Sequence, residues 1–440
     1  MKLGKIIFLF ISLKLGSFSL VTYSLPSDGQ DTASVLARKP SQDAHYLDIP
    51  THKLLGILKD PQNRVNPLFQ VPASIKSEVG FWFQIYAKYS LYQTLLYDRD
   101  NPQLIYEVID NRDFFQQGLS AAAIEVKSKQ RIQKVITDYK NAFQKLKQNQ
   151  NTVFPKDSAG YHITHFWGKK SSKKWKEIED NFRTQPGQRD RIMQGLVAAD
   201  PFLPAMESIF KKFSLPIEIT RLPLVESSFN LRAYSKADAV GVWQFLKPSA
   251  EEYLIVDEKN SIDERLSPIK STYAAAKMFQ RNYKLLKDYG LSIIAYNHGA
   301  KNLVSLKEKY AGKNIAWLIK KQESPLGYAS RNFYCEFLAL LHAERYRQEI
   351  YSMESPNKIG SISIVKVKKS LSIFEISSQY NISIHELRLF NPDIFDYKKK
   401  LPIGTRVVIP KKVEGSIVLS PVQEKTRDIA SDLEFIEEIR

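Results

Sequence analysis

Cysteine is almost missing from this chain: Cys335 is the only one among 440 residues. A single cysteine excludes an intrachain disulfide and any zinc site built on several thiolates. It also leaves no cysteine near the N-terminus that could carry a lipid. Cys335 lies in the apolar, helix-periodic run RNFYCEFLALLHAERYRQEIY (331–351), so core packing is its expected role.

Three common catalytic signatures are missing too. The sequence contains no HExxH, no GxxxxGK[ST] and no GxSxG, so it lacks the usual patterns of zinc proteases, P-loop NTPases and α/β-hydrolases. His162 and His165 stand three residues apart, but a zinc site needs a third protein ligand and none is evident. We therefore expect no metal and no cofactor, and interpret both histidines as packing or surface residues.

Negative charge is scarce relative to positive charge, with 64 Lys and Arg against 47 Asp and Glu and a formal net charge of +17. Such an excess suits an anionic polymer or surface as a partner, nucleic acid included. It also keeps a lysine-rich protein soluble without any specific partner. Composition leaves these alternatives open.

Long apolar runs are missing as well, because Lys14 interrupts the apolar stretch that contains IIFLFISL. A stretch this short and broken makes a poor membrane-spanning helix. A basic start, a short apolar run and small residues near Ser24 are typical of a secretory signal peptide. We therefore predict a signal peptide over 1–24 and export to the periplasm or cell envelope, which argues against nucleic acid as a partner. An uncleaved anchor, and with it a peripheral membrane association, stays open, and the oligomeric state is not predicted.

The length predicts two or three domains rather than one, and an apolar content of 43% is enough to give them cores. The expected divisions are a lead-in or linker (25–75), an accessory α/β subdomain (76–150), a mainly helical domain (151–345), a linker (346–360), a small strand–helix–helix–strand unit (361–412) and an acidic tail (413–440). The tail has seven acidic and three basic residues. We expect it to be a short amphipathic helix or to lack fixed structure in part.

Local signals predict several individual elements. TLLYDRDNPQLIYEVID (94–110) is typical of a β-hairpin, and the periodic run 121–148 predicts a helix. SPIKSTYAAAKMFQRNYKLLKDYG predicts a long helix that begins after Ser267 as the N-cap and stops at Gly290. LSIIAYNH is expected to form a short helix that closes at Gly299. The predicted fold class is therefore mainly α.

One carboxylate stands out within RLPLVESSFN (221–230). Glu226 follows Leu224 and Val225 and precedes Phe229, and apolar neighbours raise the pKa of a carboxyl group. A neutral carboxylic acid can donate a proton to a leaving oxygen at neutral pH. The alternative is an ordinary surface glutamate at a helix end, which is the commoner role of such a residue.

Two further motifs carry groups that suit a neutral polyhydroxylated ligand such as a sugar. GVWQF offers backbone that can approach a ligand at Gly241 and the side-chain amide of Gln244. AYNHG offers the hydroxyl of Tyr296 and the amide of Asn297. Trp243 could present a flat face, but a tryptophan in such a run is more often part of the core. Each motif alone is weak evidence.

The three motifs occur in order within LPLVESSFNLRAYSKADAVGVWQFLKPSAEEYLI, IDERLSPIKSTYAAAKMFQRNY and LSIIAYNHGAKNLV. Over about 185–305 the chain resembles the membrane-bound lytic murein transglycosylase D family, which has the goose-type lysozyme-like, SLT-type fold. The resemblance implies a lysozyme-like catalytic domain that acts on peptidoglycan glycan strands. It implies cleavage of the β-1,4 bond between N-acetylmuramic acid and N-acetylglucosamine with formation of a 1,6-anhydro ring.

The resemblance also implies a role for each site residue. The ES motif places a single catalytic group, first acid and then base, on Glu226. Ser227, Gly241, Gln244, Tyr296 and Asn297 are then expected to bind the substrate or orient the acid. The DER stretch 263–265 matches a family segment that we interpret as structural. Two alternatives stay open: a hydrolytic muramidase, and a non-catalytic scaffold that only binds peptidoglycan.

The unit at 361–412 resembles a LysM domain, through IVKVKKSLSIFEISSQYNISIHELRLFNP followed by LPIGTRVVIPKK. This resemblance implies binding of glycans that contain N-acetylglucosamine. The family's usual Gly-Asp-Thr-Leu turn reads SLSI from Ser370 onward. Because that turn lies near the glycan groove in the family, we expect a changed affinity.

Overall fold

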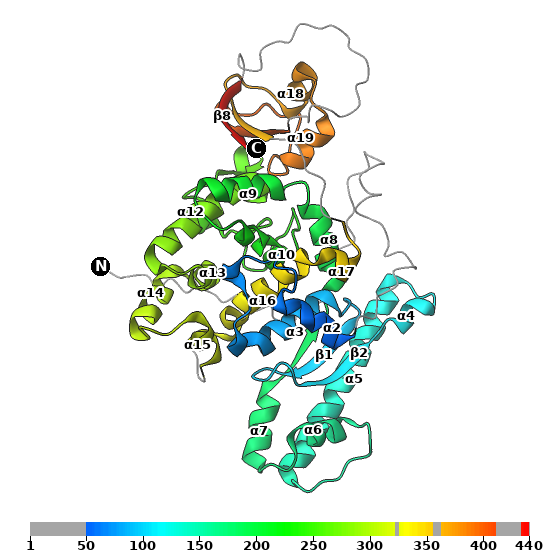
Figure 1. Ribbon diagram of the computed structural model, residues 1–440. Helices are drawn as coiled ribbons and strands as arrows, with labels where there is room; N and C mark the ends of the chain where they lie inside the picture. The colour runs from blue at the N-terminus through cyan, green and yellow to red at the C-terminus, as the bar shows by residue number, and fades with distance from the viewer. Residues whose placement is uncertain (1–49, 322–324, 355–361, 411–432, 440) are drawn as a thin grey trace, which may run out of the picture.

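The computed structural model describes residues 50–321, 325–354, 362–410 and 433–439, and within them the chain is mainly helical, as predicted. Figure 1 shows a central helical body, a lobe at one end that contains strands β1 and β2, and a small C-terminal module at the other end. The predicted signal peptide, 1–24, lies outside the described residues. None of the described helices is long and apolar enough to cross a membrane.

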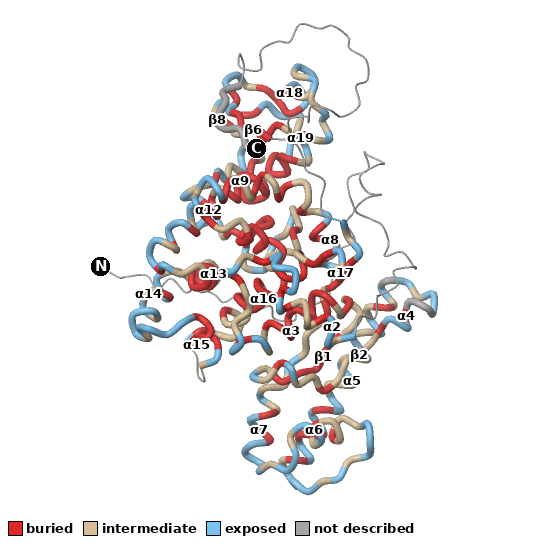
Figure 2. The backbone as a smooth tube through the Cα atoms, viewed as in Figure 1, coloured by how far each residue is buried: buried red, intermediate tan, exposed pale blue. Residues whose placement is uncertain are grey.

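Most of the helices belong to the central body. They are α2 (Thr51–Gly56), α3 (Lys76–Ala87), α8 (Arg189–Ala199), α9 (Leu203–Lys212), α10 (Leu222–Ser227), α11 (Lys247–Ala250), α12 (Pro268–Leu286), α13 (Tyr289–His298), α14 (Ala300–Lys309), α15 (Ile315–Lys320), α16 (Tyr328–Arg345) and α17 (Arg347–Tyr351). Short 3-10 turns join them, among them η4 (Ile217–Arg221) and η6 (Glu264–Leu266), and β4 (Val256–Asp257) pairs with β5 (Ile262–Asp263). Most residues of the largest apolar cluster lie in this body, and Figure 2 shows many buried residues there.

Helix α12 begins where the sequence predicts and ends earlier. The Ser267 hydroxyl accepts a hydrogen bond from the Lys270 amide, as expected of an N-cap. The helix stops at Leu286, where Lys287 adopts a left-handed conformation (φ 52°). Gly290, the predicted stop, lies inside α13 instead, because the Asp288 side chain caps that next helix. The predicted closure of α13 at Gly299 (φ 92°) is confirmed.

Helix α16 is the central helix of the core. It packs against α3, α10 and α13, and it is the helix predicted from the apolar run around Cys335. That cysteine is fully buried and not in a disulfide, which confirms its packing role. The run does not continue as one helix, since Tyr346 separates α16 from α17.

The lead-in is packed more firmly than predicted over its described part, 50–75. It consists of α2 and three 3-10 turns, η1 (Ile57–Lys59), η2 (Pro67–Phe69) and η3 (Ala73–Ile75). The side chains that it contributes to the main core are Leu54, Leu58, Val65, Phe69 and Ile75. These apolar residues lie among prolines and polar residues without regular spacing, so periodicity does not reveal them.

The lobe below the central body has its own core. A three-stranded sheet of order β2-β1-β3 joins β1 (Gln93–Asp98), β2 (Ile105–Asp110) and β3 (Phe182–Pro186), and the lobe's helices are α4 (Asp113–Gln116), α5 (Ala121–Gln148), α6 (Ala159–Trp167) and α7 (Ser172–Asn181). The antiparallel β1–β2 pair and α5 confirm the predicted hairpin and helix. Tyr139, Phe143 and Trp175 are completely buried in this core. This core therefore contains residues from both sides of the domain boundary that was expected at residue 150.

The C-terminal module has the predicted order of strand, helix, helix and strand. The elements are β6 (Ile362–Val367), α18 (Ile373–Tyr380), α19 (Ile384–Phe390) and β7 (Arg406–Pro410). The short helix that was one expectation for the tail is not found in its described part. Instead of a helix, β8 (Leu433–Ile439) forms an antiparallel third strand on the free edge of β6. Strand pairing with an edge supplies backbone hydrogen bonds that local sequence does not encode.

Candidate active site

Glu226 lies in the last turn of α10 and is half-buried. The chain turns sharply after it, since Ser228 and Phe229 both have left-handed backbones (φ 50° and 54°). The Phe229 ring is buried and packs against Phe202 with ring centroids 5.8 Å apart. This turn ends the helix while its last residues stay at the edge of the core. Glu226 is therefore not a surface glutamate of the ordinary kind.

Two consecutive carbonyl groups hold the other motifs beside α10. The Ser227 hydroxyl donates to the carbonyl of Val242 over 3.0 Å. The Tyr296 hydroxyl donates to the carbonyl of Trp243 over 2.6 Å. The segment 241–245 thus bonds to α10 on one side and to α13 on the other. The structure brings together the three motifs that the sequence analysis singled out.

Gly241 makes its close contact with the protein itself. It has φ +76°, and a Cβ atom there would lie 1.9 Å from the carbonyl oxygen of Arg265. Gln244 also has a left-handed backbone (φ 52°), and its side-chain Nε2 donates to the Gly241 carbonyl over 2.8 Å. Only glycine fits position 241 without displacing backbone. The role of Gly241 in approach to a ligand stays a prediction.

The DER segment supports the same turn, in agreement with its interpretation as structural. Arg265 Nη1 donates to the carbonyls of Asp238 and Phe245, at 3.2 and 3.4 Å. Its guanidinium is held by Asp263, with Nη2 and Oδ2 2.7 Å apart. The charged pair is almost fully buried. Arg265 therefore fixes both ends of the segment that contains Gly241.

Tyr296 faces the core, whereas its neighbour Asn297 is exposed. The Tyr296 ring stacks on Phe279 with centroids 5.1 Å apart. Asn297 Oδ1 accepts a hydrogen bond from the Ser330 hydroxyl over 3.0 Å, which ties α13 to α16. Trp243 is completely buried, as expected of a core residue, and its Nε1 donates to Thr272 over 2.9 Å.

Burial decides the protonation of Glu226. Loss of hydration, helped by the negative charge of Glu336, raises the pKa of Glu226 to about 8. Burial also raises the pKa of Glu336 to about 8, against the effect of a hydrogen bond from the Tyr86 hydroxyl. Burial and the nearby Glu226 raise the pKa of Tyr296. At neutral pH the site thus holds neutral carboxylic acids that can donate a proton.

Glu336 is the residue that the sequence analysis missed. It lies on α16, which packs against the helix that carries Glu226. The signal was available, because Glu336 is the only acidic residue in the apolar run FYCEFLALL (333–341), just as Glu226 is in PLVESSF. What the sequence could not give is the contact between two helices far apart in the chain.

The two histidines singled out in the sequence are engaged in packing. His162 Nδ1 and the Tyr139 hydroxyl lie 2.9 Å apart, and His165 stacks on Tyr161 with centroids 5.9 Å apart. Among the described residues, no group of three or more His, Cys, Asp or Glu side chains could hold a metal ion. The carboxyl groups of Glu226 and Glu336 can take part in proton transfer.

Comparison with known proteins agrees with this geometry. Residues 206–319 match the transglycosylase SLT domain. The chain is 27% identical over 220 residues to membrane-bound lytic murein transglycosylase D of Escherichia coli K12, which is 49% of this chain and 47% of that protein. The same protein of Escherichia coli O6:H1 (strain CFT073) gives the same values. A protein of Alteromonas sp. (strain M-1) named for tributyltin chloride resistance is 37% identical over 102 residues, 23% of this chain and 49% of that protein.

The chain spans about half the length of the curated relatives that it matches. Glu226, the 241–245 turn and the Tyr296–Asn297 pair all lie inside the matched SLT segment, and Glu336 lies beyond it. The segment 206–319, which carries Glu226, therefore matches the transglycosylase SLT domain, and the chain is similar to membrane-bound lytic murein transglycosylase D.

Proposed function

We propose that this chain is a peptidoglycan lytic transglycosylase, which cleaves the bond between N-acetylmuramic acid and N-acetylglucosamine and leaves a 1,6-anhydro end. One observation carries the proposal. Within the SLT segment, Glu226 has a pKa of about 8 and lies on a helix bonded to the turn that also holds Tyr296. A protonated carboxyl group so placed can act as a general acid at neutral pH.

In this mechanism protonated Glu226 donates its proton to the glycosidic oxygen while the bond from that oxygen to C1 breaks. Positive charge develops at C1 of the muramic sugar. The Glu226 carboxylate then accepts the proton of the C6 hydroxyl, whose oxygen forms a bond with C1. Glu226 returns to its starting form and no water is consumed. Because the nucleophile is part of the same sugar, a second carboxylate is not required.

The remaining site residues divide into two proposed roles. Ser227 and Tyr296 spend their hydroxyl protons on backbone carbonyls, so we assign them to holding Glu226 and the 241–245 turn in place. Gln244 and Asn297 carry amide groups that are half-buried and exposed, respectively. Amides both donate and accept hydrogen bonds, so these two suit the acetamido and hydroxyl groups of the glycan. Gly241 lets the 241–245 turn lie close to the Arg265 carbonyl.

A hydrolytic muramidase is the second candidate, and Glu336 is the observation that favours it. A second carboxylate near the acid could activate a water molecule, as in many glycosidases. It must be ionised for that role. Since burial raises the pKa of Glu336 to about 8, this group is mostly neutral at pH 7, which favours the lyase.

The products separate the two candidates. Purified peptidoglycan digested with the full chain should yield soluble muropeptides whose muramic ends carry the 1,6-anhydro ring in mass spectrometry. Ends that are reducing sugars, one water heavier, would contradict the lyase and support the muramidase. No soluble product at all, with the glycan still bound, would support the non-catalytic scaffold.

We also propose that the chain acts in the cell envelope, where its substrate lies, and that the C-terminal module binds glycan. The support for the first is the similarity to a protein named membrane-bound. The support for the second is the observed strand–helix–helix–strand order and ten basic against four acidic residues over 361–412. A positive module is attracted weakly to an acidic wall polymer, in a salt-dependent way.

Activity should fall above pH 8. The acid form of Glu226 is the active form, and its pKa is about 8, so kcat/KM should be flat below that pH and drop about tenfold per pH unit above it. Glu336→Gln removes a negative charge that raises the pKa of Glu226, so the fall in kcat/KM should begin at a lower pH in this variant. The two carboxyl groups titrate as a coupled pair, so the profile reports the pair.

The pH–rate profile is best measured on a soluble glycan fragment, with Glu251→Gln as the control because that side chain is exposed. We expect the control to keep the wild-type profile. An unchanged profile in Glu336→Gln would show that Glu336 does not influence the acid.

A further inference from the structure

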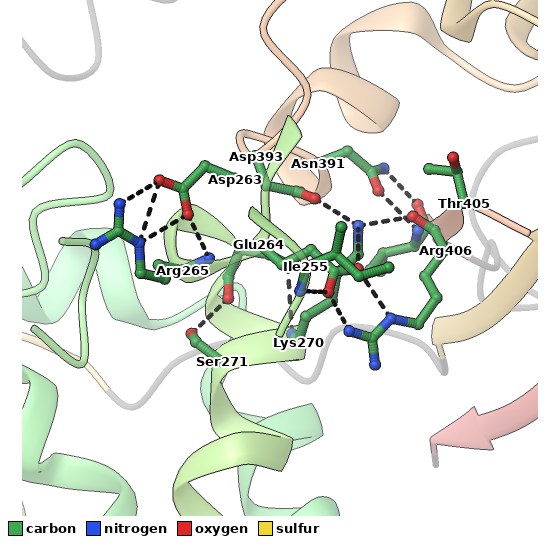
Figure 3. A network of polar contacts seen from close by, with 12 residues as sticks. Ile255, Asp263, Glu264, Arg265, Lys270, Ser271, Asn391, Asp393, Thr405 and Arg406 are labelled. Atoms are coloured by element: carbon green, nitrogen blue, oxygen red, sulfur yellow. Dashed lines mark hydrogen bonds and ion pairs between the residues drawn. The ribbon is translucent and has the colours of Figure 1, made fainter. Parts of the chain in front are cut away.

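The C-terminal module contacts the central body through a buried ionic network (Figure 3). Lys270 of α12 donates from Nζ to Asp393 Oδ2 over 2.5 Å and to the Arg406 carbonyl over 2.7 Å. The Lys270 and Asp393 side chains are 1% and 0% exposed. Charges buried this deeply are costly unless each has its partner. The pair therefore requires the module to sit against α12.

A second ion pair lies beside the first. Arg406 of β7 donates from Nε to Glu264 Oε1 over 2.8 Å, and its Nη2 contacts Glu264 Oε2. The Glu264 side chain is 1% exposed, and its Oε2 also accepts the Ile255 amide over 2.8 Å. A two-point contact between guanidinium and carboxylate fixes direction as well as distance.

A backbone seam runs alongside these charges. Ile262 and Ile394 form an antiparallel bridge. The Asp263 amide donates to the Asp393 carbonyl over 2.9 Å, and the Phe395 amide donates to the Ser261 carbonyl over 3.0 Å. Ile262 belongs to the apolar core of the module although it precedes the module by a hundred residues or so. The module's core is thus completed by the central body.

The segment that meets the module also supports the 241–245 turn beside Glu226. Asp263 and Glu264 contact the module through a backbone amide and a side chain. Arg265, next in the chain, holds the carbonyls of Asp238 and Phe245, and Gly241 packs on its carbonyl. One short stretch therefore touches the module on one side and the 241–245 turn on the other.

We propose that the C-terminal module is docked on the SLT domain as a fixed part of it, and that Glu264, Lys270, Asp393 and Arg406 are positioning residues for the turn beside Glu226. A module that only tethered the chain to a glycan would have no use for buried charges shared with its neighbour. The docking contacts fix the segment 263–265, and this segment in turn fixes the 241–245 turn. The second half of this inference rests on the proposed function, whereas the docking does not.

A disulfide between Ile262→Cys and Ile394→Cys tests the docking. The two backbone hydrogen bonds lie on either side of Ile262 and Ile394 and not between them. In such a non-hydrogen-bonded antiparallel pair the Cα atoms lie about 4.5 Å apart. That separation is within the range that a disulfide spans. In the full chain under mild oxidation, we expect nearly complete cross-linking. The matched control pairs Ile262→Cys with Ile403→Cys, since Ile403 is 72% exposed and is not part of the 262–394 bridge.

Cross-linking no greater than in the control pair would overturn the docking. This readout does not depend on activity, so it separates failure of the docking from failure of the proposed function. If the chain is active with the module docked, the cross-linked chain should also keep its activity. Loss of activity that a reductant restores would show that the module must move.

Arg406→Gln tests the positioning role. On a soluble tetrasaccharide we expect kcat to fall about tenfold with little change in KM, because the acid and the turn lose their alignment. Arg406→Lys should restore part of the loss. Arg281→Gln is the control, since its side chain is 50% exposed and its ion pair with Glu252 lies outside the module. A wild-type kcat in Arg406→Gln would contradict the positioning role.

Discussion

Replacing Glu226 by glutamine should lower the rate of peptidoglycan cleavage by about a thousandfold or more. Glutamine has nearly the same shape but cannot donate an acidic proton to the leaving oxygen or accept one from the C6 hydroxyl. Glu226 performs both steps in the proposed mechanism, so a single substitution removes both. The measurement is the initial rate of release of soluble muropeptides from purified peptidoglycan.

The same variant should be folded, and its stability should depend less on pH. The pKa of Glu226 is about 8 in the folded chain against an ordinary value of 4.5. Between these pH values the folded state binds more protons than the unfolded state, so wild-type stability falls as the pH rises. Glutamine does not ionise, so Glu226→Gln loses this dependence. Thermal unfolding of both proteins at pH 5 and pH 8 should show the smaller loss in the variant.

Glu251→Gln serves as the control, since this exposed residue should change neither rate nor stability. Wild-type turnover in Glu226→Gln would remove Glu226 from its proposed role. If Glu226→Gln failed to fold, this result would contradict the inference that the folded chain favours the neutral form of Glu226.

Gly241→Ala should be strongly destabilising. The new Cβ atom would lie 1.9 Å from the Arg265 carbonyl oxygen, and the backbone there has φ +76°. Left-handed strain costs about 1–2 kcal/mol, and forced repacking of a close contact costs about 1–3 kcal/mol more. We expect a loss of about 2–5 kcal/mol in the free energy of unfolding, together with reduced activity because the turn beside Glu226 must shift.

Gly312→Ala provides a matched control for this change. Gly312 has almost the same backbone angle (φ +78°), but an added Cβ would meet nothing within 4 Å. The control should therefore lose only the strain contribution, about 1–2 kcal/mol. Denaturant unfolding of the two variants measures the difference, which isolates the contact with Arg265. Equal losses would show that the contact yields easily and that Gly241 is needed only for its backbone angle.

Sequence was a good guide where the signal is local. Ser267 and Gly299 fix helix ends through their own neighbours, and the 94–110 hairpin joins strands close in the chain. Glu226 could be singled out because the residues that bury it are partly its sequence neighbours. In each case a few adjacent residues contain the cause.

Long-range contacts explain what the sequence did not reveal. Glu336 influences Glu226 only because α16 packs on α10. Gly241 is restricted by the carbonyl of Arg265, in a later turn. Strand β8 exists because β6 offers an open edge. From the sequence, Lys270 looks like an ordinary exposed lysine of a helix. Its burial becomes evident only from its contact with Asp393 of the module.

Glu226 should be a neutral acid at neutral pH, and its protonation can be observed directly. The full chain labelled with carbon-13 in its glutamate side-chain carboxyl groups can be titrated by infrared or NMR spectroscopy, with Glu226→Gln assigning the signal. We predict a protonated carboxyl signal at pH 7 that is lost with an apparent pKa of about 8. A carboxylate signal at pH 7, with titration near the ordinary value of 4.5, would contradict the account.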